Sequence, residues 1–388
     1  MLINNVQIIN NEQHSSQISI KGSKITEVNL FNFHKDENYK ELSFNFSNAI
    51  AFPGLVNSHD HLEFNLFPKL GNRIYNDYIE WGNDINEQNK KQIEIVKKVP
   101  KDLHYKWGLY KNLICGVTTI INHGKILDTQ HNNLPDVYSN YNYLHSLSTE
   151  KKWKIKFLFK LNRLPVLIHI GEGINKESAD EINRLIKWNI LKKDLIGIHA
   201  IAMNEKQSKK FKAIIWCPDS NSFLYNKTAN IPLLKKHSNI LFGTDSTLSA
   251  DWNLWNHLRL ARDLNYLNEY ELFFSISETA SKVWGLKSKG KIEINKSADI
   301  VICKKKYKKN WESFYSINPE DILLIVKNGI VVFIDSELII QHQNINKDDF
   351  DVIYINSIKK YIIKGIRNLI QSINALLPEY EFPISISK

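Results

Sequence analysis

Residues 53–61 read Pro-Gly-Leu-Val-Asn-Ser-His-Asp-His, a short apolar run that ends in two histidines separated by one residue. In an extended strand, side chains two positions apart project from the same face, so both imidazoles can reach one metal ion. A pair of this kind arises easily by chance in a chain that has 13 histidines. The pair therefore becomes informative only through the positions of other polar residues.

Three later apolar runs also end in a histidine or an acidic residue. They end in His169, which is followed by Glu172, in His199 and in Asp245. Taken singly, a strand-end histidine usually packs in the core, Glu172 could be a solvated loop acid and Asp245 could cap a helix. Taken together, they predict a cluster, because the carboxyl ends of the strands in a parallel α/β barrel converge on the active-site face. Imidazole and carboxylate donors of this kind suit zinc or ferrous iron.

The middle of the chain alternates between short apolar runs and amphipathic helical stretches. Strands are expected at 55–57, 117–122, 166–170, 196–199, 214–217 and 240–243, and helices are expected at 178–188 and 255–264. So many repeats of strand and helix favour a closed parallel barrel. We therefore predict an α/β fold in which residues 53–286 form a (β/α)8-type TIM barrel.

One part of this barrel is too short for the regular pattern. Only about fifty residues separate Thr119 from His169, and residues 151–164 read as a helix. This length does not hold two full strand–helix units, each of which needs a strand, a helix and two loops. We expect one barrel strand to be distorted or missing.

Both ends of the chain are rich in strands. Residues 18–20 face 25–28 across a turn, and 322–326 face 330–334 across Asn328-Gly329, a hairpin signal. Residues 1–52 plus 287–342 are therefore predicted to form one small composite β-sandwich domain. Residues 343–388 are predicted as a C-terminal helical extension. Its apolar residues fall at helical spacing, namely Ile358, Tyr361, Ile362, Ile366, Leu369 and Ile373. Packing on the barrel is favoured for this helix, and a homodimer contact stays open.

The ordered motifs resemble those of the amidohydrolase superfamily, specifically the mononuclear-metal branch that contains cytosine deaminase, guanine deaminase and the triazine chlorohydrolases. The resemblance covers nearly the whole chain, up to about residue 340. The matching stretches are Pro53–His61, Gly116–Thr119, His169–Glu172, Cys217–Asn221, Gly243–Ser246 and Lys296–Ile300.

The resemblance implies a set of site residues. His59, His61, His169 and Asp245 would bind one divalent metal, for which we favour zinc over iron. Glu172 would be the proton shuttle. His199 would be the orienting or polarising group beside the activated water, and Asp245 can also hold a proton there. Two-metal relatives use a carboxylated lysine on the fourth strand, and none is evident here, so we predict a single metal.

We predict a hydrolase acting on a non-peptide carbon–nitrogen bond, with deamination of a cyclic amidine by metal-activated hydroxide as the favoured reaction. The alternatives are an amide-bond or halide-displacing hydrolase of the same superfamily and, more distantly, a non-enzymatic metal-retaining or nucleic-acid-binding protein. His123, at the end of the second expected strand, and Trp81 are candidates for contact with the substrate. Core packing explains these two residues equally well.

The composition and the charge pattern limit the classes of partner that we expect. The net charge is +10, but the lysine runs are scattered and no nucleic-acid-binding motif accompanies them. No apolar run reaches the length of a membrane span, and the first residues do not resemble a signal peptide. The three cysteines lie far apart, which is typical of a reducing cytoplasm. We expect a cytoplasmic enzyme with a small-molecule substrate and with no nucleic-acid or membrane partner.

Overall fold

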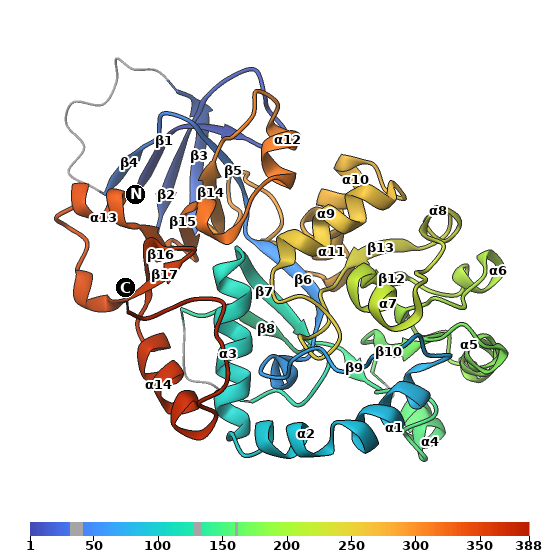
Figure 1. Ribbon diagram of the computed structural model, residues 1–388. Helices are drawn as coiled ribbons and strands as arrows, with labels where there is room; N and C mark the ends of the chain where they lie inside the picture. Colours follow the sequence, from blue (N-terminus) through green and yellow to red (C-terminus); the bar gives the residue numbers. More distant parts are fainter. Residues whose placement is uncertain (32–41, 128–132, 160–161, 388) are drawn as a thin grey trace.

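The computed structural model describes residues 1–31, 42–127, 133–159 and 162–387. The middle of the chain forms a barrel of short strands, and both chain ends together form a large sheet beside it (Figure 1). The barrel strands are β6 (Leu55–Asp60), β7 (Val117–Asn122), β8 (Asp136–Tyr138), β9 (Asn142–Tyr143), β10 (Val166–Ile170), β11 (Leu195–His199), β12 (Ala213–Trp216) and β13 (Asn239–Phe242). All six strands predicted for this region are confirmed.

The barrel strands pair in parallel in two ladders, β6-β7-β8 and β9-β10-β11-β12-β13. Nearly every residue of the longer strands is buried, as expected where helices cover the outside of a parallel sheet. The covering helix α5 (Lys176–Trp188) begins after the cap Asn175 and buries Ile182 and Leu185. Around the barrel lie also α1 (Tyr78–Gln88), α2 (Lys90–Val96), α3 (Lys101–Ile114), α4 (Trp153–Phe159), α6 (Glu205–Ser208), α7 (Pro218–Tyr225), α8 (Ile231–Leu234), α9 (Leu254–Leu264), α10 (Glu269–Ser275) and α11 (Glu278–Trp284).

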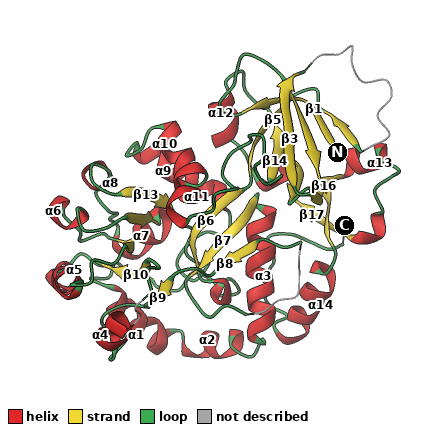
Figure 2. Ribbon diagram, turned by 180° about the vertical axis from the view of Figure 1, so that it is seen from behind, coloured by secondary structure: helices red, strands yellow, loops and turns green. Residues whose placement is uncertain are grey.

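Strands β8 and β9 are two halves of one passage of the chain. Residues 136–138 pair with β7, residues 142–143 pair with β10, and only residues 139–141 lie between them. One bent passage therefore makes the pairings that two strand–helix units would otherwise make (Figure 2). The expectation of a distorted or missing barrel strand is confirmed, because three residues leave no room for a helix between the two pairings.

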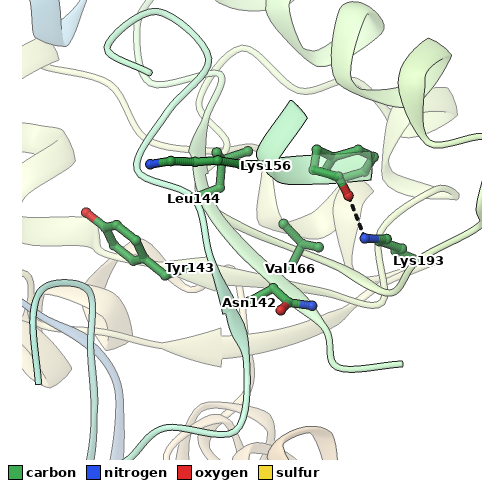
Figure 3. Close-up of a pocket in the computed structure, with 7 residues that line it drawn as sticks. Asn142, Tyr143, Leu144, Lys156, Val166 and Lys193 are labelled. Carbon is green, nitrogen blue, oxygen red and sulfur yellow. Dashed lines mark hydrogen bonds between the residues drawn. The ribbon is translucent and has the colours of Figure 1, made fainter. Parts of the chain in front are cut away.

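The outer side of this passage is covered by α4. Figure 3 shows Asn142, Tyr143 and Leu144 running beside Val166, with Lys156 and Lys193 across a small hollow. The hollow has a volume of about 10 Å³, which is room for about one water molecule. This outer hollow is too small to accept a substrate.

The chain ends form one ten-stranded sheet, in which β5 (Ala49–Pro53) joins the two halves. β5 pairs with β1 (Leu2–Ile8) in parallel and with β14 (Ile300–Lys304) in antiparallel, and it leads directly into β6. The other strands are β2 (Ser16–Lys21), β3 (Lys24–Leu30), β4 (Ser43–Asn45), β15 (Ile322–Lys327), β16 (Ile330–Asp335), β17 (Phe350–Ile355) and β18 (Ile358–Ile363). Both predicted hairpins, β2–β3 and β15–β16, are present, and both chain ends contribute to one β unit as expected. Two short helices, α12 (Asn310–Tyr315) and α13 (Ser336–Gln341), connect its strands.

The predicted helical extension over residues 343–388 is wrong for its first half. Residues 350–363 form the hairpin β17–β18, which adds to β16, and the helix α14 (Ile366–Leu376) begins only at Ile366. Asn356 and Ser357 both have positive φ, as a two-residue hairpin turn requires. Burial in both strands alternates residue by residue. The apolar residues of 358–373 gave a helical spacing because they belong to two elements in succession, the alternating strand β18 and the helix α14.

Helix α14 packs against α3, which agrees with the expected packing on the barrel. The hydroxyl group of Tyr110 on α3 donates to the carbonyl oxygen of Lys364 at 3.1 Å. In the described ranges, none of the helices has the length and apolar character needed to cross a membrane.

The β17–β18 hairpin depends on a buried ion pair. The Nζ of Lys360 lies 2.6 Å from Oδ2 of Asp335 and 2.7 Å from the carbonyl oxygen of Ile322. We expect Lys360→Ala to lower the free energy of unfolding by about 3–5 kcal/mol, because Asp335 would remain buried without its partner. The exposed Lys364→Ala should change it by less than about 0.5 kcal/mol. Urea denaturation followed by circular dichroism tests this, and equal effects of the two substitutions would contradict it.

Candidate metal centre

The carboxyl ends of five barrel strands bring together seven buried side chains of types that can bind metals. They are His59, His61, His123, His169, Glu172, His199 and Asp245. The donor atoms of His59, His61, His123 and His169 lie within 4.8 Å of one another. The donor atoms of a second group, His59, His199 and Asp245, lie within the same distance of one another. So do those of a third group, His169, Glu172 and His199. The three groups share members and so form one continuous cluster.

Three of the four predicted ligands lie close around one point. The Nε2 of His169 is 3.3 Å from Nε2 of His61 and 3.4 Å from Nε2 of His59. Asp245 belongs to the second donor group, and its Oδ1 lies 3.7 Å from Nε2 of His59. Burial lowers the pKa of His59 and His169 well below the usual range, which keeps them in the neutral form that binds metals. These donors fit zinc, which takes imidazole nitrogens and a carboxylate oxygen.

The strand ends turn sharply at the residues of this cluster. His199 and Asp245 have φ values of 67° and 56°, and Gly171, between His169 and Glu172, has a φ of 61°. For a residue with a Cβ atom this left-handed conformation is uncommon, and strained backbone of this kind gathers at functional sites. The amides of Thr244 and Asp245 both donate to the carbonyl oxygen of His59, at 3.0 and 3.1 Å. These bonds fix the end of β13 against the end of β6.

Asp60, between the two histidines of β6, is held in a fully buried polar network. Its carboxylate lies 3.0 Å from Nζ of Lys111 and accepts hydrogen bonds from the side-chain amides of Asn65 at 2.8 Å and Asn112 at 2.7 Å. Thr244, the residue before Asp245, also donates to it at 3.4 Å. The network therefore ties the histidine pair to helix α3 and to the end of β13.

The two predicted catalytic residues Glu172 and His199 face each other. Oε2 of Glu172 is 3.7 Å from Nε2 of His199, and its Oε1 accepts a hydrogen bond from the Tyr225 hydroxyl group at 3.0 Å. Burial raises the pKa of Glu172. Nδ1 of His199 lies 2.8 Å from Oδ1 of Asn221, an acceptor, so Nδ1 carries the hydrogen. Nε2 of His199 is then the atom that faces Glu172 and Asp245.

The two substrate candidates occupy different surroundings. His123 belongs to the four-histidine group, with Nδ1 3.2 Å from Nε2 of His169. Trp81 donates its indole hydrogen to the carbonyl oxygen of Leu70 at 2.8 Å and packs on the apolar cluster that includes Tyr75 and Tyr225. A substrate role for either residue stays a prediction.

Sequence reasoning missed two residues at this site. The ring of His145 lies 5.0 Å from that of His169, and burial lowers its pKa to about 4. It follows the two-residue strand β9, which is too short to show any periodicity. Tyr225 lies at the end of α7, where its sequence context resembles that of any buried aromatic residue. Only the fold brings its hydroxyl group to Glu172.

Comparisons with known proteins agree with this architecture. Residues 152–332 match the amidohydrolase family, and no curated protein matches the sequence. Among solved structures, an adenosine deaminase from Xanthomonas campestris with bound zinc has 15% identity, covers 98% of each chain and gives a TM-score of 0.71. An atrazine chlorohydrolase from Arthrobacter aurescens in complex with zinc has 15% identity, covers 97% of this chain and 100% of that one, and gives 0.67. Helicobacter pylori aminofutalosine deaminase has 16% identity, covers 85% and 99%, and gives 0.60. At these identities the likeness to the solved structures establishes the fold.

Gly243 offers a test of the geometry. A Cβ atom at this position would lie 2.6 Å from Cβ of His59 and 3.1 Å from Sγ of Cys217. We expect Gly243→Ala to weaken zinc binding about 10–100-fold, the range typical of residues that support metal ligands. Gly82→Ala, in open space on α1, is the control and should keep the affinity. Competition with a chromophoric chelator measures both, and unchanged binding in Gly243→Ala would show that His59 does not hold the ion.

Proposed function

We propose, because residues 152–332 match the amidohydrolase family, that the chain is a hydrolase acting on carbon–nitrogen bonds and that its favoured reaction is deamination of a cyclic amidine. One observation carries this proposal: a buried carboxyl group with a raised pKa, Glu172, lies beside a cluster of buried imidazoles. Such a carboxyl group can give a proton to a departing amino group at neutral pH.

His59, His61, His169 and Asp245 would hold one divalent ion, and the zinc in the related structures supports zinc over iron. Such an ion, when bound, lowers the pKa of water to about 7 and supplies a nucleophile. Two hydrogen bonds hold the carboxylate of Asp245 in one orientation. Its Oδ1 accepts from the amide of Ser246 at 2.9 Å, and its Oδ2 accepts from the hydroxyl group of Ser249 at 3.0 Å. The carboxylate can therefore accept a proton without turning.

Glu172 would transfer a proton, and His199 would stabilise charge. Glu172, held by Tyr225, delivers a proton to the leaving nitrogen, an acid–base contribution of about 10²–10⁴ in rate. His199, fixed by Asn221, presents Nε2 toward the reacting region and can form a hydrogen bond to the atom that gains charge. Both side chains are buried, and the exclusion of water strengthens these interactions.

Halide displacement is the second candidate, since one of the similar structures is a chlorohydrolase. A departing chloride needs no proton, whereas a departing amine does. The raised pKa of Glu172 therefore favours deamination. Release of ammonia or of chloride from a panel of aminated and chlorinated pyrimidines, purines and triazines separates the two reactions.

We expect the purified protein to contain close to one zinc or iron per chain. The described residues offer one continuous group of donors and no second, separate group of three or more. Elemental analysis after exhaustive dialysis tests this expectation. Two tightly bound ions per chain would contradict the single-metal assignment.

Glu172→Gln should lower ammonia release by at least about 10²-fold, because the amide cannot transfer a proton. Its metal content should stay near that of the unchanged protein, since Glu172 is assigned to proton transfer and not to metal binding. Tyr225→Phe, which keeps the ring and removes only the hydrogen bond, should have a smaller effect. Loss of the metal from Glu172→Gln would show that the residue is a ligand.

A further inference from the structure

The hydrogen bonds of His123 determine which of its ring nitrogens carries hydrogen. Nε2 lies 3.3 Å from the carbonyl oxygen of Leu144, which can only accept, so Nε2 is the donor. A neutral imidazole has one N–H group, and the other nitrogen then has a free lone pair. In His123 this is Nδ1, which points toward Nε2 of His169 at 3.2 Å. His123 therefore presents a lone pair to the group formed by His59, His61 and His169.

This group is not stable as a set of hydrogen bonds alone. Nε2 of His169 has three nitrogen neighbours, in His59, His61 and His123, at 3.2–3.4 Å. A single hydrogen on that nitrogen can satisfy only one of them. If that nitrogen carries no hydrogen, it can accept from His59 or His61, but its lone pair then faces the lone pair of His123 Nδ1 in a buried place, where unsatisfied polar atoms are costly. A cation among the four nitrogens turns every one of these lone pairs into a favourable contact.

The spacing of the nitrogens also fits one ion. A tetrahedral zinc site with Zn–N bonds of about 2.0–2.1 Å places its donor atoms about 3.3–3.4 Å apart. The three separations from Nε2 of His169, at 3.2, 3.3 and 3.4 Å, agree with this spacing, and all four donor atoms lie within 4.8 Å of one another. The contact of Asp245 with His59 is longer, at 3.7 Å, and Asp245 belongs to a different donor group.

We propose that His123 is a metal ligand, so that four imidazoles, those of His59, His61, His123 and His169, hold the ion in this chain. This deepens the proposed function and rests on it in one respect, because the chain must bind a metal. The assignment replaces contact with the substrate as the role of His123, and His123 takes the place of Asp245 as the fourth ligand. Asp245 then faces the ion from the side of His199 and Glu172, where its carboxylate can serve as proton acceptor.

The alternative is that His123 supports His169 from outside the coordination sphere. That role requires a hydrogen on Nε2 of His169, donated to Nδ1 of His123, and a protonated Nε2 cannot bind the metal. Since Nε2 of His169 is also the atom nearest to His59 and His61, this alternative removes His169 from the centre. The two arrangements thus differ in the number of imidazoles on the ion.

Zinc titration of variants tests the proposal. His123→Phe keeps an aromatic ring beside Tyr143 and His145 but has no donor atom. We expect it to bind zinc more than about 100-fold less tightly, beyond the 10–100-fold typical of outer-sphere partners. His123→Asn, whose Oδ1 can take the place of Nδ1, should recover part of the affinity. Tyr143→Phe, which removes only a hydroxyl group from the ring that packs on His123, is the control and should bind zinc normally.

X-ray absorption fine structure of the zinc-loaded unchanged protein gives a second readout, in which we expect four imidazole scatterers, falling to three in His123→Asn. Circular dichroism of the metal-free variants checks that they fold, and the count in the unchanged protein remains decisive if His123→Phe does not. Three imidazoles in the unchanged protein, or zinc affinity within about tenfold of it in His123→Phe, would overturn the role of His123 and leave the proposed function standing. Absence of zinc binding by the unchanged protein would instead overturn the proposed function.

Discussion

A buried negative charge between the two histidines of β6 is the constraint on which the site depends. Asp60 is fully buried, and a carboxylate removed from water is tolerated only when it is paired and hydrogen-bonded. Lys111 and Asn112 on α3 and Asn65 after η1 (Leu62–Phe64) meet this requirement. In doing so they fix the strand end that carries His59 and His61.

The same network reaches the end of the chain. The carbonyl oxygen of Asn65 accepts hydrogen bonds from the indole of Trp107 at 2.9 Å and from the hydroxyl group of Tyr380 at 3.2 Å. The segment after α14 therefore contacts the residues that support the histidine pair. Pieces of the molecule more than 300 residues apart in sequence thus share one set of polar contacts with the candidate centre.

The sequence predicted those parts of the site that follow from local rules. His59, His169, His199 and Asp245 could be found because each closes an apolar run, and strand ends of a parallel barrel meet on one face. The bend at residues 139–141 could not be found, since pairings of two or three residues have no period. The β17–β18 hairpin was missed because its apolar residues merge with those of α14. The free lone pair of His123 depends on the carbonyl group of Leu144, a contact that only the folded chain creates.

The single passage at 136–143 changes the perimeter of the barrel, and this has a consequence for the centre. Neighbouring strands lie about 4.8 Å apart, so two strands between β7 and β10 would separate them by about 14 Å, whereas one strand separates them by about 10 Å. His123, which follows the carboxyl end of β7, therefore lies next to His169 on β10. The bent passage that leaves no room for a covering helix on the outside thus brings a further histidine nitrogen to the cluster on the inside.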